Sequence, residues 1–253
     1  MKQKEKIAAF ISIEFGMVIL CTLPLFLLHA EPASSLMLLT SIIFMFLPAL
    51  TTLIVKRMAH DKGGLFLQLN IRKAWKQYLL AALIPGALEG IGVALYFFIF
   101  PSHLDLSLTY AAQLLTLNGQ TVELPQLSLP LAIGVGLLLI LAAPLVIVNH
   151  AAAFGEEIGW RSFLLPLLMD ELGARKAVLL DGVLWGIAHA PLVCFGLNYT
   201  GEYPGAPWSG ILMMVLFAST TGIFFSYLTL KSRSIFRPAS PMEQSMPFGK
   251  RRF

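Results

Sequence analysis

Residues 155–166 read Gly-Glu-Glu-Ile-Gly-Trp-Arg-Ser-Phe-Leu-Leu-Pro, and the apolar runs around them set the interpretation of the whole chain. Two adjacent carboxylates, Glu156 and Glu157, and the guanidinium of Arg161 stand between those runs. A charged side chain in hydrocarbon costs several kcal/mol, about 2.5 or more. Packing alone does not account for three such groups, so this stretch is a candidate functional site in a membrane protein.

The composition agrees with that interpretation. The chain has 253 residues, of which 57% are hydrophobic and only 13% charged, whereas soluble domains carry roughly 25% charged residues. A membrane span needs about 20 apolar residues. Runs of this kind cover 7–29, 34–55, 77–100, 128–149, 177–197 and 209–230, with a further apolar piece at 150–169.

These runs predict an all-α fold, a polytopic transmembrane bundle of about six to seven membrane helices. The stretch 128–169 is too long for one straight crossing at about 1.5 Å per residue. We therefore expect a kinked or re-entrant helix there, which is tolerated at membrane depth where it lines a cavity. We predict a single membrane-embedded domain over 1–230 and a polar, basic tail over 231–253.

The basic residues predict the orientation. Lys and Arg occur at 2–6, 56–76, 175–176 and 231–233, while the connectors 30–33, 101–127 and 198–208 contain none. The positive-inside rule then places the N-terminus and the C-terminal tail of this cell-membrane protein in the cytoplasm. The net charge of +4 is explained by this topology and by contact with the lipid bilayer, so no nucleic-acid partner is expected.

The spacing of the charged residues assigns them different directions. Glu157 and Arg161 are four residues apart and share a helix face, which predicts an ion pair. Glu156 is rotated by about 100° from Glu157 and is free to face a cavity. It then has two possible roles: a general base for hydrolysis, or a protonated glutamate that packs between helices.

A second polar stripe lies one apolar run further on. Asp181, Trp185 and His189 follow each other at intervals of four residues and line one helix face. His189 either holds or activates a water together with Glu156, or ligates a metal. A gap of about 5–6 Å between the two groups, which one water bridges, would support the first role. Asp181 either orients a neighbour or is a buried protonated acid. Pro191 is expected to kink or end this helix near His189.

Three other polar residues occur in apolar runs. Glu14 and Glu89 are intramembrane acids, which are functional by default. No spacing connects them with residues 155–166, however, and a packing or hydrogen-bonding role is favoured for each. His150 precedes Glu156 by six residues and is a candidate site-lining group.

Together these residues resemble the motifs of the CAAX protease and bacteriocin-processing family, also called CPBP or Abi. Glu156, Glu157 and Arg161 match its Glu-Glu-x-x-x-Arg motif, and Trp185 and His189 match its second motif, an aromatic residue four positions before a histidine. The resemblance covers about 128–240. It implies an intramembrane endopeptidase similar to type II CAAX prenyl endopeptidases.

The resemblance also implies roles. Such a protein cuts near the C-terminus of lipid-modified proteins, or processes peptides as in bacteriocin maturation and self-immunity. Its partners are therefore a peptide or membrane-associated protein substrate and the lipid bilayer. Glu156 and His189 would activate the attacking water, and Glu157 and Arg161 would shape the site. The family's catalysis has been described with and without a metal; if one is used, zinc held by Glu156 and His189 is expected.

The chain departs from the family pattern at two places. Ser162 stands where the family commonly has glycine. The third motif, a histidine four residues before an asparagine on a final span, is missing from the tail. Shifting the reading frame of 240–247 by two nucleotides allows Ala-His-Gly-Ala-Ile-Asn-Ala, so we hypothesise a frameshifted tail, which the DNA sequence tests.

The alternative function is a non-catalytic membrane protein with an immunity or scaffold role; a transporter is less well supported.

Overall fold

The computed structural model describes residues 1–30, 34–67, 71–109, 112, 123–142, 153–199 and 203–232. Every regular element in these ranges is helical. Four segments are long and apolar enough to cross a membrane: Gln3–Leu27, Ser35–Met58, Ala174–Cys194 and Trp208–Lys231. The prediction of an all-α helical bundle is confirmed, and the chain is an integral membrane protein. Its predicted orientation stays a prediction.

The chain folds as two compact units. The first comprises 1–77 and 148–253, and the second comprises 78–147. The second unit holds most of α3 (Ile71–Ile99), the short η1 (Pro101–His103) and α5 (Leu129–Ala142). The predicted span 77–100 is helical to residue 99, and 128–149 is helical from 129 to 142, beyond which it lies outside the described residues. The prediction of one domain over 1–230 is not tested by this division.

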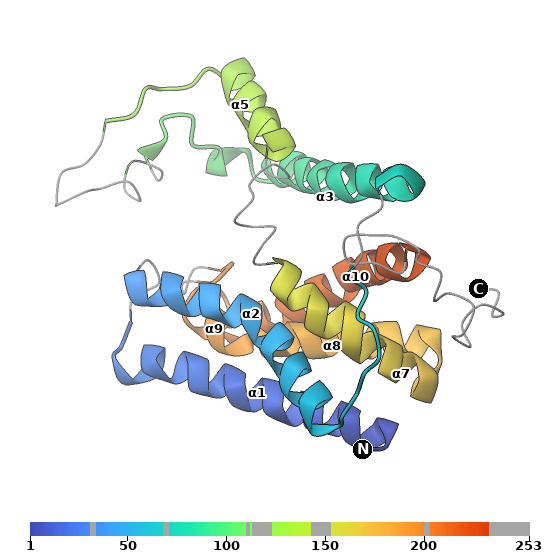
Figure 1. Ribbon diagram of the computed structural model, residues 1–253. Helices are drawn as coiled ribbons and strands as arrows, with labels where there is room; N and C mark the ends of the chain where they lie inside the picture. The colour runs from blue at the N-terminus through green and yellow to red at the C-terminus, as the bar shows by residue number, and fades with distance from the viewer. Residues whose placement is uncertain are drawn as a thin grey trace. The chain divides into compact units, whose positions relative to one another are not determined.

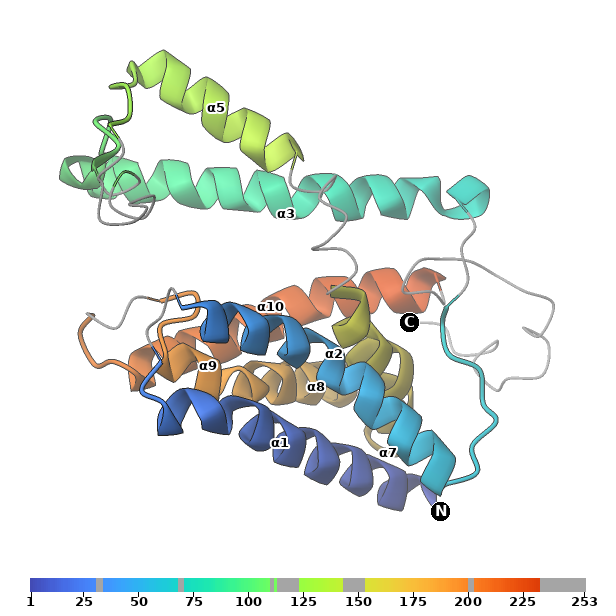
Figure 2. The ribbon, with the colours of Figure 1, turned by 60° about the vertical axis from the view of Figure 1, so that its left-hand side comes forward.

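The first unit contains the two motifs. Its helices are α1 (Gln3–Leu27), α2 (Ser35–Met58), α7 (Leu165–Leu172), α8 (Ala174–Ala188), α9 (Ala190–Cys194) and α10 (Trp208–Ser232). In Figures 1 and 2, α1 lies beside α2, and α8 lies beside α10. Buried apolar side chains join α1 to the motif region, with the Phe10 ring 5.6 Å from that of Trp160 and 5.7 Å from that of Phe163. Outward leucines such as Leu20 and Leu27 are exposed, as expected of lipid-facing positions.

The Glu-Glu-x-x-x-Arg motif begins in an α-helix and ends in a widened helical turn that contains Arg161. Residues 153–157 are α-helical, and the chain then forms a π-helical segment, η3 (Ile158–Leu164), before α7. Pro166, in the first turn of α7, has no N–H to donate to a carbonyl four residues earlier. This loss favours the wider hydrogen-bonding pattern of a π turn, which often occurs at functional sites. The expected kink or re-entrant break within 128–169 stays a prediction, because residues 143–152 lie outside the part of the chain that the structure describes.

Two glycines let η3 lie against the backbone of α2. A Cβ added at Gly155 would lie 2.6 Å from the Met45 carbonyl oxygen, and one at Gly159 would lie 2.7 Å from the Pro48 carbonyl carbon. Carbon atoms normally approach only to about 3.5 Å. Only residues without a side chain fit at these two positions, so the glycines set how closely α2 approaches the motif.

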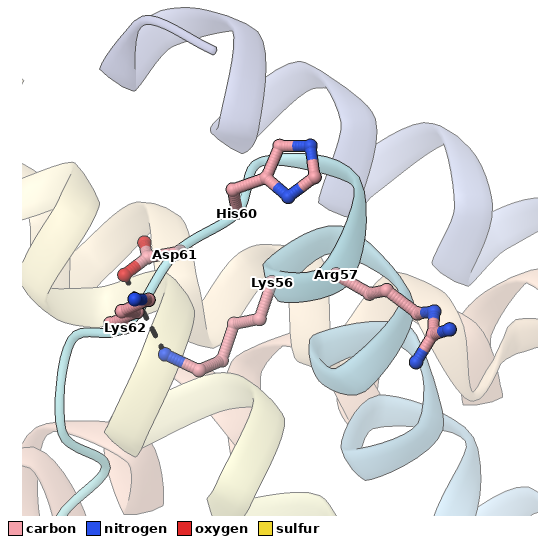
Figure 3. Close-up of a pocket in the computed structure, with 5 residues that line it drawn as sticks. All are labelled: Lys56, Arg57, His60, Asp61 and Lys62. Carbon is pink, nitrogen blue, oxygen red and sulfur yellow. Dashed lines mark ion pairs between the residues drawn. The ribbon is translucent and has the colours of Figure 1, made fainter.

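The end of α2 carries a charged cluster. Lys56 and Arg57 lie in its last turn, where cations interact favourably with the helix dipole. Asp61 pairs with Lys6 at 2.5 Å and with Lys56 at 3.6 Å, and Figure 3 shows the Lys56 side chain extended toward it. The hydrogen bond from Lys6 lowers the pKa of Asp61. A surface cavity of about 490 Å³ is lined by Lys56, Arg57, His60, Asp61 and Lys62, and its lining contains no motif residue.

Candidate active site

Arg161 is the centre of the buried charges. Its side chain is fully buried, and its Nη1 lies 3.3 Å from Glu157 Oε1, the ion pair that the spacing predicts. A second carboxylate lies at the other end of the guanidinium, with Asp181 Oδ2 3.5 Å from Nε. The guanidinium carbon is 4.2 Å from the centre of the Trp185 ring, within the range of a cation–π contact. Arg161 thus links η3 to α8.

The predicted stripe on α8 faces this guanidinium. Asp181 is completely buried, and Trp185 and His189 are each 6% exposed. The stripe ends where the helix does, because α8 ends at Ala188 and α9 begins at Ala190 with Pro191 in its first turn. The expected break near His189 is therefore present. Since the N–H of His189 donates to Gly186, the Trp185 carbonyl is available to the imidazole.

The imidazole of His189 is oriented by that carbonyl. Its Nδ1 lies 2.9 Å from the carbonyl oxygen of Trp185. A carbonyl can only accept, so Nδ1 carries the proton, and in the neutral ring Nε2 presents a lone pair. The Phe44 ring of α2 packs edge-on against the imidazole, at 4.9 Å between ring centres. His189 is thus fixed both in tautomer and in orientation.

Glu156 lies next to that lone pair. Its Oε1 is 3.5 Å from His189 Nε2 and accepts a hydrogen bond of 3.4 Å from the indole N–H of Trp185. This contact is shorter than the gap of about 5–6 Å that would hold one bridging water. The two groups lie closer because Trp185 binds both, Glu156 through its indole N–H and His189 through its carbonyl oxygen.

The structure also brings Glu14 to this region, a connection that the sequence did not reveal. Glu14 is buried on α1, and its Oε2 accepts a hydrogen bond of 2.5 Å from Thr51 on α2. Its carboxyl interacts electrostatically with that of Glu156. One helical turn away, Phe10 contacts Trp160, which is one turn from Glu156.

Ser162, the departure from the family's glycine, has a local role. Its hydroxyl accepts the backbone N–H of Phe66 at 2.7 Å, which fastens the segment after α2 to η3. Two other candidates are not described: His150 lies outside the described residues, and nothing is known of the side chain of Glu89. The predicted tail beyond residue 232 also lies outside them.

The described donors do not make a zinc site. Zinc is typically held by three or four protein ligands, and Glu156 and His189 supply two. Among the described residues, no three His, Cys, Asp or Glu side chains are arranged to hold a metal ion. The mechanism proposed below therefore uses no metal, and zinc stays an untested prediction.

Comparisons with known proteins agree with the two motifs. Residues 128–240 match the family model described as type II CAAX prenyl endopeptidase Rce1-like. CAAX prenyl protease 2 of Methanococcus maripaludis is 31% identical over 91 residues, which are 36% of this chain and 33% of that relative. The match thus spans about a third of the relative's length. No solved structure matches the chain. Residues 128–240, which contain both motifs, are therefore similar to the Rce1-like domain of type II CAAX prenyl endopeptidases.

Proposed function

We propose that this protein is an intramembrane endopeptidase in which Glu156 and His189 activate the water that attacks a peptide carbonyl. The observation that carries the proposal is the contact of 3.5 Å between Glu156 Oε1 and His189 Nε2. With Nδ1 bonded to the Trp185 carbonyl, Nε2 can accept a hydrogen bond, and so can the carboxylate. One water can donate an O–H to each of them.

A bridging water requires a larger distance between Glu156 and His189 than the one observed. A water that donates two hydrogen bonds of about 2.8 Å, with its O–H bonds about 105° apart, spans acceptors about 4.4 Å apart. The contact between Glu156 and His189 must therefore open by about 1 Å when water binds. Catalytic contacts commonly readjust on substrate binding, and the side chain of Glu156 has the rotatable bonds to do so.

Glu156 carries the proton through the proposed reaction. Glu156 takes a proton from the water while the water oxygen bonds to the carbonyl carbon of the substrate. The carbon–nitrogen bond breaks, and Glu156 returns the proton to the leaving amine. His189 Nε2 holds the second hydrogen of the water and so directs its lone pair. Glu157 and Arg161 take no proton; they hold the site's shape through their ion pair.

The substrate that we propose is a prenylated protein or peptide with a C-terminal CAAX sequence, which follows from the family and from the relative's printed name. The test uses a quenched fluorescent farnesylated CAAX peptide and protein reconstituted in liposomes. We expect Glu156→Gln and His189→Ala each to lower turnover by about 10²- to 10⁴-fold. Glu171→Gln is the matched control, since Glu171 pairs with Lys4 on α1 and is expected to keep wild-type turnover.

Equal turnover by the wild type, Glu156→Gln and His189→Ala would refute this mechanism. A second candidate is the non-catalytic membrane role, which is favoured by the absence of the third family motif from 231–253. It predicts that the wild type leaves the farnesylated peptide intact in the same liposomes. The assay thus separates the two functions before any variant is made.

A further inference from the structure

Asp181 is a buried acid that the proposed reaction does not use. It lies on α8, one turn before Trp185 and two before His189, and is 0% exposed. An unpaired carboxylate in such a place is costly. Oδ2 of Asp181 lies 3.5 Å from Nε of Arg161, with which it forms an ion pair. Because Asp181 is fully covered, it cannot touch a substrate, and any effect on the reaction must pass through Arg161.

Arg161 is held from two sides. Glu157, on the same helix, approaches Nη1, while Asp181, on α8, approaches Nε. Neither contact has the geometry of a hydrogen bond, so the two carboxylates hold the guanidinium by charge, from two sides. Helix α10 closes the space behind it, since a Cβ added at Gly222 would lie 3.3 Å from Nη2. The guanidinium is therefore confined by its neighbours as well as neutralised.

The guanidinium of Arg161 lies over the ring of Trp185, which hydrogen-bonds to both Glu156 and His189. Its carbon is 4.2 Å from the centre of the Trp185 ring. The indole N–H of Trp185 binds Glu156, and its carbonyl binds His189. A shift of the indole would therefore change the position of the carboxylate relative to the imidazole. Charge neutralisation alone, by contrast, would leave the indole where it is.

We propose that Asp181 is a positioning residue of the active site, which holds Arg161 on the ring of Trp185 and thereby sets the distance between Glu156 and His189. The inference rests on the proposed endopeptidase function. It adds a residue outside the two family motifs to the machinery of the site, and it predicts a structural effect at Trp185 that is measurable without any substrate.

The experiment compares the wild type with Asp181→Asn and Asp181→Ser. Thr22→Val is the matched control, because Thr22 is a buried polar residue whose hydroxyl binds only carbonyls of its own helix. Each protein is labelled with 5-fluorotryptophan, and the Trp185 signal is assigned among the four tryptophans with Trp185→Phe. Fluorine NMR in detergent and hydrolysis of the farnesylated CAAX peptide are measured on the same samples.

In both Asp181 variants we expect the Trp185 signal to shift or broaden while the Trp75 and Trp208 signals stay in place. We expect kcat to fall by about 10- to 100-fold, the loss that follows a displacement of about 1 Å. KM should stay within about twofold, since a residue that binds no substrate affects the transition state alone. The control should match the wild type in both measurements.

Two results would overturn the proposal. An unmoved Trp185 signal together with wild-type kcat would show that Asp181 positions nothing. Failure of both Asp181 variants to fold, judged by thermal unfolding, would assign the residue to stability instead. If the wild type does not cut the peptide, the proposed function fails, but the fluorine spectra still decide whether Asp181 fixes Trp185.

Discussion

Replacing Gly159 by alanine is expected to separate α2 from the motif. The new Cβ would lie 2.7 Å from the carbonyl carbon and oxygen of Pro48 and would clash with its Cβ. Normal contacts between carbons are about 3.5–4.0 Å, so the two backbones must move apart by about 1 Å. Overpacking of this kind costs about 1–3 kcal/mol, from which the gain of replacing a helical glycine, about 0.5–1 kcal/mol, is subtracted.

The same shift reaches the active site, since Phe44 on α2 packs against His189. A displacement of about 1 Å is expected to lower peptide hydrolysis about 10²-fold. The assay is thermal unfolding in detergent, followed by tryptophan fluorescence, together with the liposome cleavage assay. Gly16→Ala is the matched control, because nothing lies within 4 Å of a Cβ at Gly16. If Gly159→Ala unfolds at the temperature of Gly16→Ala, the argument for close packing is wrong.

Three further substitutions test other contacts. Thr51→Val removes the hydroxyl that binds buried Glu14 and is expected to lower the free energy of unfolding by about 1–3 kcal/mol; an unchanged unfolding midpoint would contradict this. Lys6 holds the pKa of Asp61 below its ordinary value. Ionised Asp61 therefore stabilises the folded state fully at a pH above the unfolded-state pKa of about 3.9. This stabilisation disappears as the pH falls through the lower folded-state pKa. The stability difference between the wild type and Asp61→Asn should therefore vanish at low pH, and a pH-independent difference would refute the pairing. Ser162→Ala leaves a loop N–H without its acceptor and should speed proteolysis of that loop, measured by limited digestion.

The part of the site that follows local spacing was predictable from the sequence. The pairing of Glu157 with Arg161 needs only that residues four apart share a helix face, and the same rule aligned Asp181, Trp185 and His189. The break at Pro191 follows from its missing N–H and its ring. These predictions hold because each depends on a single helix.

The remaining features depend on contacts between distant segments. Thr51 binds Glu14 across 37 positions of sequence, and no periodicity within either apolar run reveals this bond. The glycine contact with Pro48 likewise joins η3 to a helix more than a hundred residues earlier. The short distance between Glu156 and His189 was not predictable, because both groups bind Trp185, and a sequence pattern does not show that one residue uses its indole and its carbonyl for different partners.

The π-helical form of η3 gives the motif an unusual sensitivity to chain length. Its hydrogen bonds enclose one more residue than those of an α-helix. The direction of the carboxylates before Ile158, relative to the helix after Leu164, therefore depends on that additional residue. Deleting one residue here would let the α-helix close and turn Glu156 by about 100° relative to α7. A single-codon deletion would thus redirect the carboxylate without altering any residue of either motif.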